Sequence, residues 1–289
     1  MKKGLFYIIL ASVLWGTSGI FVHFLAPYGV TSLQMTFIRG LVSFICMGGY
    51  VLIFNRSLAK TNFKEILLFM GGGLSFFTTA SCYYQSMQLT SISTAVVLMY
   101  TAPIFVMIYS VLFLGEKLNT MKIVSVAGML VGCGLVSGII GGLKFDPVGI
   151  AIGFLSGISY AAFNIITKIE MQKGINPMKA NFYCFFFSIF AGLAIAKPAG
   201  IIYCISLDPL TVILLGIGVG VVACILPYIF YTMALRELPA GIVSSLGILE
   251  PMAATLFSVA IFGEKLSVYS IVGILLILGS VFMLSKQKQ

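Results

Sequence analysis

Long apolar segments recur from one end of the chain to the other, separated by short polar stretches. A membrane-spanning helix needs about 20 consecutive apolar residues. On that length the pattern predicts ten spans, at residues 5–25, 32–54, 65–86, 91–114, 120–139, 149–167, 177–196, 210–235, 241–262 and 267–285. The first run lacks a small-residue cleavage site before the next polar turn, so we interpret it as a retained helix and not as a signal peptide. The predicted fold class is an all-α integral membrane protein.

Composition supports this class and excludes several others. The chain is 60% hydrophobic and 9% charged, whereas soluble domains carry about 25% charged residues. The six cysteines form no CxxC pair and there is one histidine, so we expect neither a metal site nor a cofactor. No GxxxxGK[ST] sequence occurs, so we do not expect ATP to drive the protein directly.

Basic residues indicate how the helices are oriented. The net charge is +9, which in a membrane protein reflects loop composition and does not predict a nucleic-acid partner. If both termini are cytoplasmic, thirteen lysines and arginines fall on the inner side and three, Lys144, Lys197 and Lys265, on the outer side. The positive-inside rule therefore places both termini in the cytoplasm, and the expected location is the cytoplasmic membrane.

The chain repeats itself. Residues 100–118, YTAPIFVMIYSVLFLGEKL, align without a gap with residues 248–266, ILEPMAATLFSVAIFGEKL, so that Pro103 corresponds to Pro251. We interpret residues 1–145 and 146–289 as two five-helix units. Because five is odd, the second unit enters the membrane from the opposite side, and such inverted repeats are typical of secondary transporters. The alternative is that duplication only enlarged a bundle.

These features together resemble a known family. The first span reads ILASVLWGTSGIFVHFL, and each half has a proline in its fourth span followed by FLGEKL or IFGEKL. The chain is similar to the EamA-type, ten-helix branch of the drug/metabolite transporter (DMT) superfamily over its whole length, most strongly over residues 228–283. The resemblance implies a secondary carrier for small organic metabolites, such as an amino-acid exporter, without fixing the substrate.

Two charges lie deep within predicted spans. Glu250 sits beside Pro251 in the ninth span, and a carboxylate at that depth is costly unless it faces protein or water. Pro251 removes a backbone donor, so we predict an opened, polar site there; the alternative is a polar contact that only fixes packing. Arg39 lies in the second span and either reaches outward to the membrane surface or points inward, to Glu250 or to a substrate carboxylate.

Aromatic and amide side chains complete the candidate binding site. Buried tyrosines need hydroxyl partners and can line a cavity or hold an organic cation. The aromatic candidates are Trp15, Tyr83, Tyr84, Tyr100, Tyr160 and Tyr228, and the amide candidates are Gln85 and Asn164. Ordinary packing is the alternative for each. Pro103, Pro227 and Pro251 are candidate hinges, and His23 is expected to meet water at the outer end of the first span.

The predicted function is alternating-access export or exchange of a small metabolite such as an amino acid, with the substrate in a central cavity between the halves. Protons or a counter-solute would supply the energy. A carrier of aromatic or quaternary-amine solutes is the main alternative, a channel is a remote one, and an enzyme is not expected. Glycines four residues apart, such as Gly128 and Gly132, permit close helix contact and leave homodimerisation open.

Overall fold

The protein is helical throughout the residues that its computed structural model describes, 2–139 and 146–285, with no strand among them. The α-helices are α1 (Lys2–Gly16), α2 (Ser18–Leu25), α3 (Ser32–Phe54), α4 (Phe63–Leu89), α5 (Ile92–Met99), α6 (Ala102–Phe113), α7 (Thr120–Val136), α8 (Pro147–Gln172), α9 (Pro177–Ile195), α10 (Ala199–Leu207), α11 (Pro209–Gly220), α12 (Leu226–Glu237), α13 (Ala240–Leu246), α14 (Leu249–Phe262) and α15 (Val268–Ser285). Three of the lysines on which the predicted orientation depends, Lys144, Lys286 and Lys288, lie outside the described residues. Residue 145, the last of the predicted first unit, also lies outside them.

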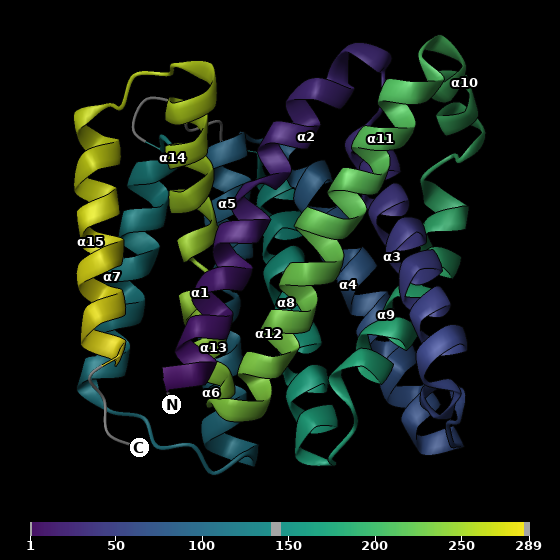
Figure 1. The fold of residues 1–289 in the computed structure, drawn as a ribbon. Coiled ribbons are helices and arrows are strands. Elements are labelled where there is room, and N and C mark those ends of the chain that lie inside the picture. Colours follow the sequence, from purple (N-terminus) through teal and green to yellow (C-terminus); the bar gives the residue numbers. More distant parts are fainter. Residues whose placement is uncertain (1, 140–145, 286–289) are drawn as a thin grey trace.

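Eight helical segments of the described chain are long and apolar enough to cross a membrane. Two further apolar helices, α7 and α15, are shorter. These segments follow the predicted spans closely, and they make the chain a multi-pass membrane protein, while the count of ten spans stays a prediction. The start of α1 and the end of α15 lie at the same end of the bundle (Figure 1); we call this the termini end. Helix α10 lies between two predicted spans, where the sequence pattern predicts no helix.

Several spans are interrupted near their middles. The span at 92–113 breaks between α5 and α6, and the span at 240–262 breaks between α13 and α14. A π-helical turn, Val221–Ile225, separates α11 from α12. The three candidate hinge prolines, Pro103, Pro227 and Pro251, each lie in the first turn of the segment that follows such an interruption, where a missing N–H is tolerated. Whether they act as hinges stays a prediction.

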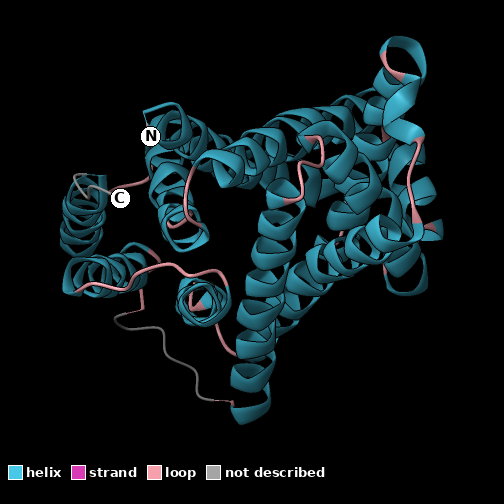
Figure 2. Ribbon diagram, turned by 90° about the horizontal axis from the view of Figure 1, so that it is seen from below, coloured by secondary structure: helices cyan, strands magenta, loops and turns pink. Residues whose placement is uncertain are grey.

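Helices α7 and α15 pack mainly on each other, at the left edge of the bundle in Figures 1 and 2. Their contact is close because glycines face each other. A Cβ built on Gly132 would lie 2.8 Å from the carbonyl oxygen of Gly273, and one on Gly273 would lie 2.6 Å from that of Gly132. Small residues let helix backbones approach in this way when lipid supplies no hydrophobic drive between helices.

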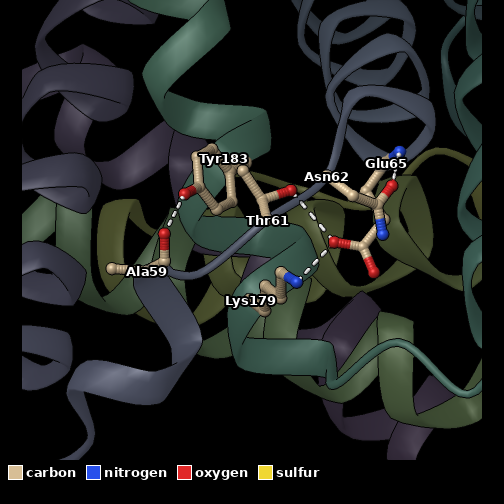
Figure 3. Close-up of polar contacts among 6 residues, drawn as sticks. All are labelled: Ala59, Thr61, Asn62, Glu65, Lys179 and Tyr183. Atoms are coloured by element: carbon tan, nitrogen blue, oxygen red, sulfur yellow. Dashed lines mark hydrogen bonds and ion pairs between the residues drawn. The ribbon is translucent and has the colours of Figure 1, made fainter.

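The connection between α3 and α4 is tied to α9 by polar contacts (Figure 3). Lys179 forms an ion pair with Glu65, which also accepts a hydrogen bond from Thr61 at 2.9 Å. The hydroxyl of Tyr183 donates to the carbonyl oxygen of Ala59 at 2.7 Å. These contacts hold the ends of three helices together at the termini end and leave the middle of the bundle free for the site.

Candidate functional site

A cavity of about 480 Å³ occupies the middle of the bundle, a volume in the range of small-molecule sites. Helices α1, α2, α3, α4, α5, α7, α8, α12 and α14 contribute to its lining. It gathers nine residues that the sequence analysis selected, Trp15, Arg39, Tyr83, Tyr84, Tyr100, Tyr160, Tyr228, Glu250 and Pro251.

The cavity has one exposed end. Its lining residues Val22 and Ile92 are 41% and 62% exposed, whereas Trp15 and Tyr100 deeper in the bundle are 4% and 2% exposed. Val22 follows α1 in the same span, and Ile92 begins α5. The cavity therefore opens away from the termini end.

Glu250 is placed by the interruption of its span. Because Pro251 has no N–H to donate to the carbonyl of Gly247, that carbonyl instead accepts the N–H of Glu250 at 3.0 Å, and a new helix starts there. This puts the carboxylate in the first turn of α14, where the helix dipole favours a negative charge. Tyr100 donates its hydroxyl to Oε2 of Glu250 at 2.8 Å. Tyr100 itself lies in the break between α5 and α6, so each interrupted span supplies one partner.

Arg39 points inward. Its side chain lines the cavity, and Nη2 donates to the carbonyl oxygen of Ala223 at 3.3 Å, in the π-helical turn. A π-helical turn shifts the backbone bonding pattern, which makes such carbonyls available to a side chain. Its Nε is buried and has no hydrogen-bond partner. Among the described residues no ion pair joins Arg39 to Glu250, so both charged groups line one cavity without neutralising each other directly.

Aromatic rings form much of the cavity wall. Tyr228 makes edge-on contacts with Trp15 at 5.1 Å, Phe76 at 5.1 Å and Phe163 at 5.6 Å between ring centroids. This T-shaped geometry is favourable between rings and holds Tyr228 in one orientation. The indole Nε1 of Trp15 is buried without a hydrogen-bond partner.

Two candidate residues lie outside this cavity. Asn164 is fully buried, and its amide donates to the carbonyl oxygen of Tyr160, one turn earlier in α8, at 2.6 Å. Gln85 lines a second cavity, of about 640 Å³, together with Gln34 and Gln88. The amides therefore do not share the space that holds Arg39 and Glu250.

Several lining residues were not predicted from the sequence. Phe76, Phe163 and Met99 line the cavity, but an apolar side chain within an apolar span carries no signal that separates lining from packing. Ser137 also lines it, immediately after the end of α7. Tyr100, which the sequence did indicate, lies three residues before Pro103, in the segment that corresponds to the one with Glu250 and Pro251 in the other half.

Comparison with known proteins identifies the family. The model of the EamA-like transporter family matches the chain twice, over residues 2–138 and again over residues 147–286. The chain belongs to the EamA-like transporter family. The resemblance to the DMT superfamily drawn from the sequence is thereby confirmed, and the chain is a membrane transporter with a small-molecule substrate.

Relatives span nearly the whole chain. An uncharacterised transporter of Archaeoglobus fulgidus is 28% identical over 98% of this chain and 96% of its own length. Solute carrier family 35 member G1 of Mus musculus is 24% identical over 96% of this chain and 76% of its own length. A crystal structure superposes with a TM-score of 0.79 over 98% of both chains at 15% identity, which shows that this EamA-like protein shares its fold.

Proposed function

We propose that this transporter exports or exchanges an amino acid or a similar zwitterion across the cytoplasmic membrane by alternating access. One observation carries the proposal: Arg39 and Glu250 line the same cavity and form no ion pair with each other. A charge held at membrane depth is costly unless a partner or water meets it. A zwitterion would supply a carboxylate to Arg39 and an ammonium group to Glu250.

The donors around the two charges support this assignment. Arg39 uses Nη2 on a backbone carbonyl, and a guanidinium carries five N–H donors, so it retains donors for a carboxylate. Tyr100 bonds only one oxygen of Glu250, and an ionised carboxylate accepts several hydrogen bonds. Both groups can therefore bind a ligand without losing the contacts that place them.

The side to which the cavity opens supports alternating access. If the termini are cytoplasmic, as the basic residues predict, the cavity opens outward in this structure. The two matches to the family model support two related halves, and inverted repeats are suited to moving a central site from one face to the other. A proton or an exchanged solute supplies the energy.

A second candidate function follows from the aromatic wall. Five tyrosines and Trp15 line the cavity, and aromatic faces attract organic cations. A carrier of quaternary amines would use these faces together with Glu250, and it would have no need of Arg39. The two candidates therefore differ in whether the substrate must carry a carboxylate.

Competition binding on the purified protein separates them. The test screens amino acids and, for those that bind, adds the methyl ester, which lacks the carboxylate, and the N-acetyl derivative, which lacks the ammonium group; choline is the quaternary-amine probe. We expect the parent amino acid to bind at least about tenfold more tightly than either derivative. Arg39→Gln should abolish discrimination against the ester, and Glu250→Gln should abolish discrimination against the N-acetyl form.

Glu237→Gln is the matched control, because Glu237 is an exposed carboxylate that does not line the cavity. It should bind and transport like the wild type in proteoliposome counterflow, while Glu250→Gln should lose most of its flux. Equal binding of an amino acid and its methyl ester, with tight binding of choline, would replace the zwitterion by an organic cation. Unaltered flux in Glu250→Gln would remove Glu250 from the mechanism.

A further inference from the structure

The connector between α12 and α13, Leu238 and Pro239, is held by two charged side chains from elsewhere in the chain. Glu116, after α6, accepts the N–H of Ala240 on Oε1 at 2.8 Å. Lys168, in α8, donates from Nζ to the carbonyl oxygens of Leu235 at 2.8 Å and of Leu238 at 2.7 Å. The backbone groups at these helix ends have no partner within their own helices, so the two charges supply what the helices lack.

This connector lies at the termini end and is tightly packed. Leu238 is 2% exposed. A Cβ built on Gly4, near the start of α1, would lie 2.6 Å from Cγ of Leu238. Parts of α1, α8 and the α6–α7 loop thus converge on one connector, at the end where the cavity is closed.

The repeat gives each of these residues a counterpart at the other end. The offset that relates Pro103 to Pro251 relates Glu116 to Glu264, Ala240 to Ile92 and Leu238 to Thr90. In the first two spans of each half the offset is 145, which relates Gly29 (φ 78°) to Gly174 (φ 73°). That offset of 145 also relates Gly4 to Gly149 and His23 to Lys168.

One part of this correspondence is present in the structure. A Cβ on Gly149 would lie 2.7 Å from Cγ2 of Thr90, as one on Gly4 would meet Leu238. The connector between α4 and α5 is therefore packed by the start of α8 in the way that the connector between α12 and α13 is packed by the start of α1.

The charged part of the correspondence is not formed. Glu264 is exposed and makes no hydrogen bond or ion pair with any other described residue. Ile92 is 62% exposed and lines the cavity. His23 is exposed, and its ring lies 4.3 Å from that of Phe262 between centroids. The cavity opens at Ile92, and neither His23 nor Glu264 bonds to the α4–α5 connector. The end with the bonded side chains is therefore shut, and the end with their unbonded counterparts is open.

We propose that Glu116 and Lys168 form a latch on the α12–α13 connector that holds the termini end shut, and that Glu264 and His23 form the corresponding latch on the α4–α5 connector in the opposite-facing state. This inference rests on alternating access in the proposed function. The transporter would then change state by releasing one pair of side chains from one connector while the other pair engages the other connector.

Hydrogen–deuterium exchange of the full chain in lipid nanodiscs tests the latch without any substrate. The variants are Glu116→Ala and Lys168→Met, with Glu264→Ala as the counterpart and Glu237→Ala, at the end of α12 just before the connector, as a neutral control. In both latch variants we expect exchange over residues 236–246 to rise at least tenfold. Exchange over α5 should fall at least threefold in the same proteins, because closing the other end covers the start of α5. Glu264→Ala should leave residues 236–246 at or below the wild-type rate, and Glu237→Ala should change neither segment.

Two results would overturn the proposal. Unchanged exchange over residues 236–246 in both Glu116→Ala and Lys168→Met would mean that these side chains do not hold the connector. Faster exchange there without slower exchange over α5 would mean that they only cap helix ends. Because no ligand is used, failure of the latch is distinguishable from failure of the zwitterion assignment, which competition binding measures.

Discussion

The packing of α7 against α15 gives a quantitative prediction for Gly273→Ala. The added Cβ would lie 2.6 Å from the carbonyl oxygen of Gly132, 2.8 Å from Cγ2 of Val136 and 2.9 Å from the backbone nitrogen of Val136. Two of these three atoms belong to the backbone and cannot rotate away. The helices must therefore separate or shift to accept one methyl group.

The expected cost follows from two opposing effects. Overpacking a close contact costs about 1–3 kcal/mol, while replacing glycine by alanine within a helix gains roughly up to 1 kcal/mol. Gly279→Ala isolates the gain, because a Cβ at Gly279, in the same helix, meets nothing within 4 Å. The free energies of unfolding of the two variants should thus differ by about 1–3 kcal/mol, with Gly273→Ala the less stable.

Thermal unfolding of both variants in one detergent measures this difference. At roughly 2 °C per kcal/mol for a chain of this size, Gly273→Ala should melt about 2–6 °C below Gly279→Ala. Both should first be shown to be monodisperse, so that aggregation does not set the transition. A melting temperature of Gly273→Ala equal to or above that of Gly279→Ala would show that α7 and α15 do not approach as closely as described.

Two hydrogen bonds give further testable predictions. Tyr100→Phe removes the hydroxyl that donates to Glu250 and should weaken binding of an ammonium ligand by roughly tenfold. The control Tyr84→Phe, in the same cavity wall, should change that affinity by less than about threefold. Equal losses of affinity in the two variants would mean that the hydroxyl of Tyr100 has no special role. Asn181 donates to Oγ1 of Thr232 at 3.1 Å and links α9 to α12, so a double-mutant cycle of Asn181→Ala and Thr232→Val, read by thermal unfolding, should give a coupling of about 0.6 kcal/mol. Additive effects in that cycle would mean that the bond contributes nothing.

Much of the fold could be predicted because hydrophobicity and length decide which segments enter a membrane. The interruptions were only partly predictable. Pro103, Pro227 and Pro251 marked three of them, since a missing N–H cannot be hidden in a helix. The break at Thr17 carries no comparable signal, because it depends on how neighbouring helices pack. The same holds for α10, a short helix between two spans.

The candidate site was predictable where a residue is expensive to bury. Glu250 and Arg39 stood out for that reason, and both line the cavity. Sequence could not decide whether Arg39 turned inward, because the carbonyl that it contacts, that of Ala223, is 184 residues away. Asn164 was equally conspicuous, yet its amide nitrogen donates to the backbone of its own helix, and its buried Oδ1 has no hydrogen-bond partner. Polarity indicates that a side chain needs a partner, and only the fold shows which partner it has.

The hydrogen bond from Tyr100 to Glu250 joins corresponding segments of the two halves, and the position that matches Glu250 in the first half is Ala102. A symmetric dimer of identical five-helix chains could not carry this arrangement. Because its subunits would be identical, such a dimer would place either two carboxylates or none beside its two-fold axis. Two carboxylates would repel each other in a medium of low polarity. Carrying both segments in one polypeptide lets a single acid occupy that place, which is what the proposed binding of one ammonium group at Glu250 requires.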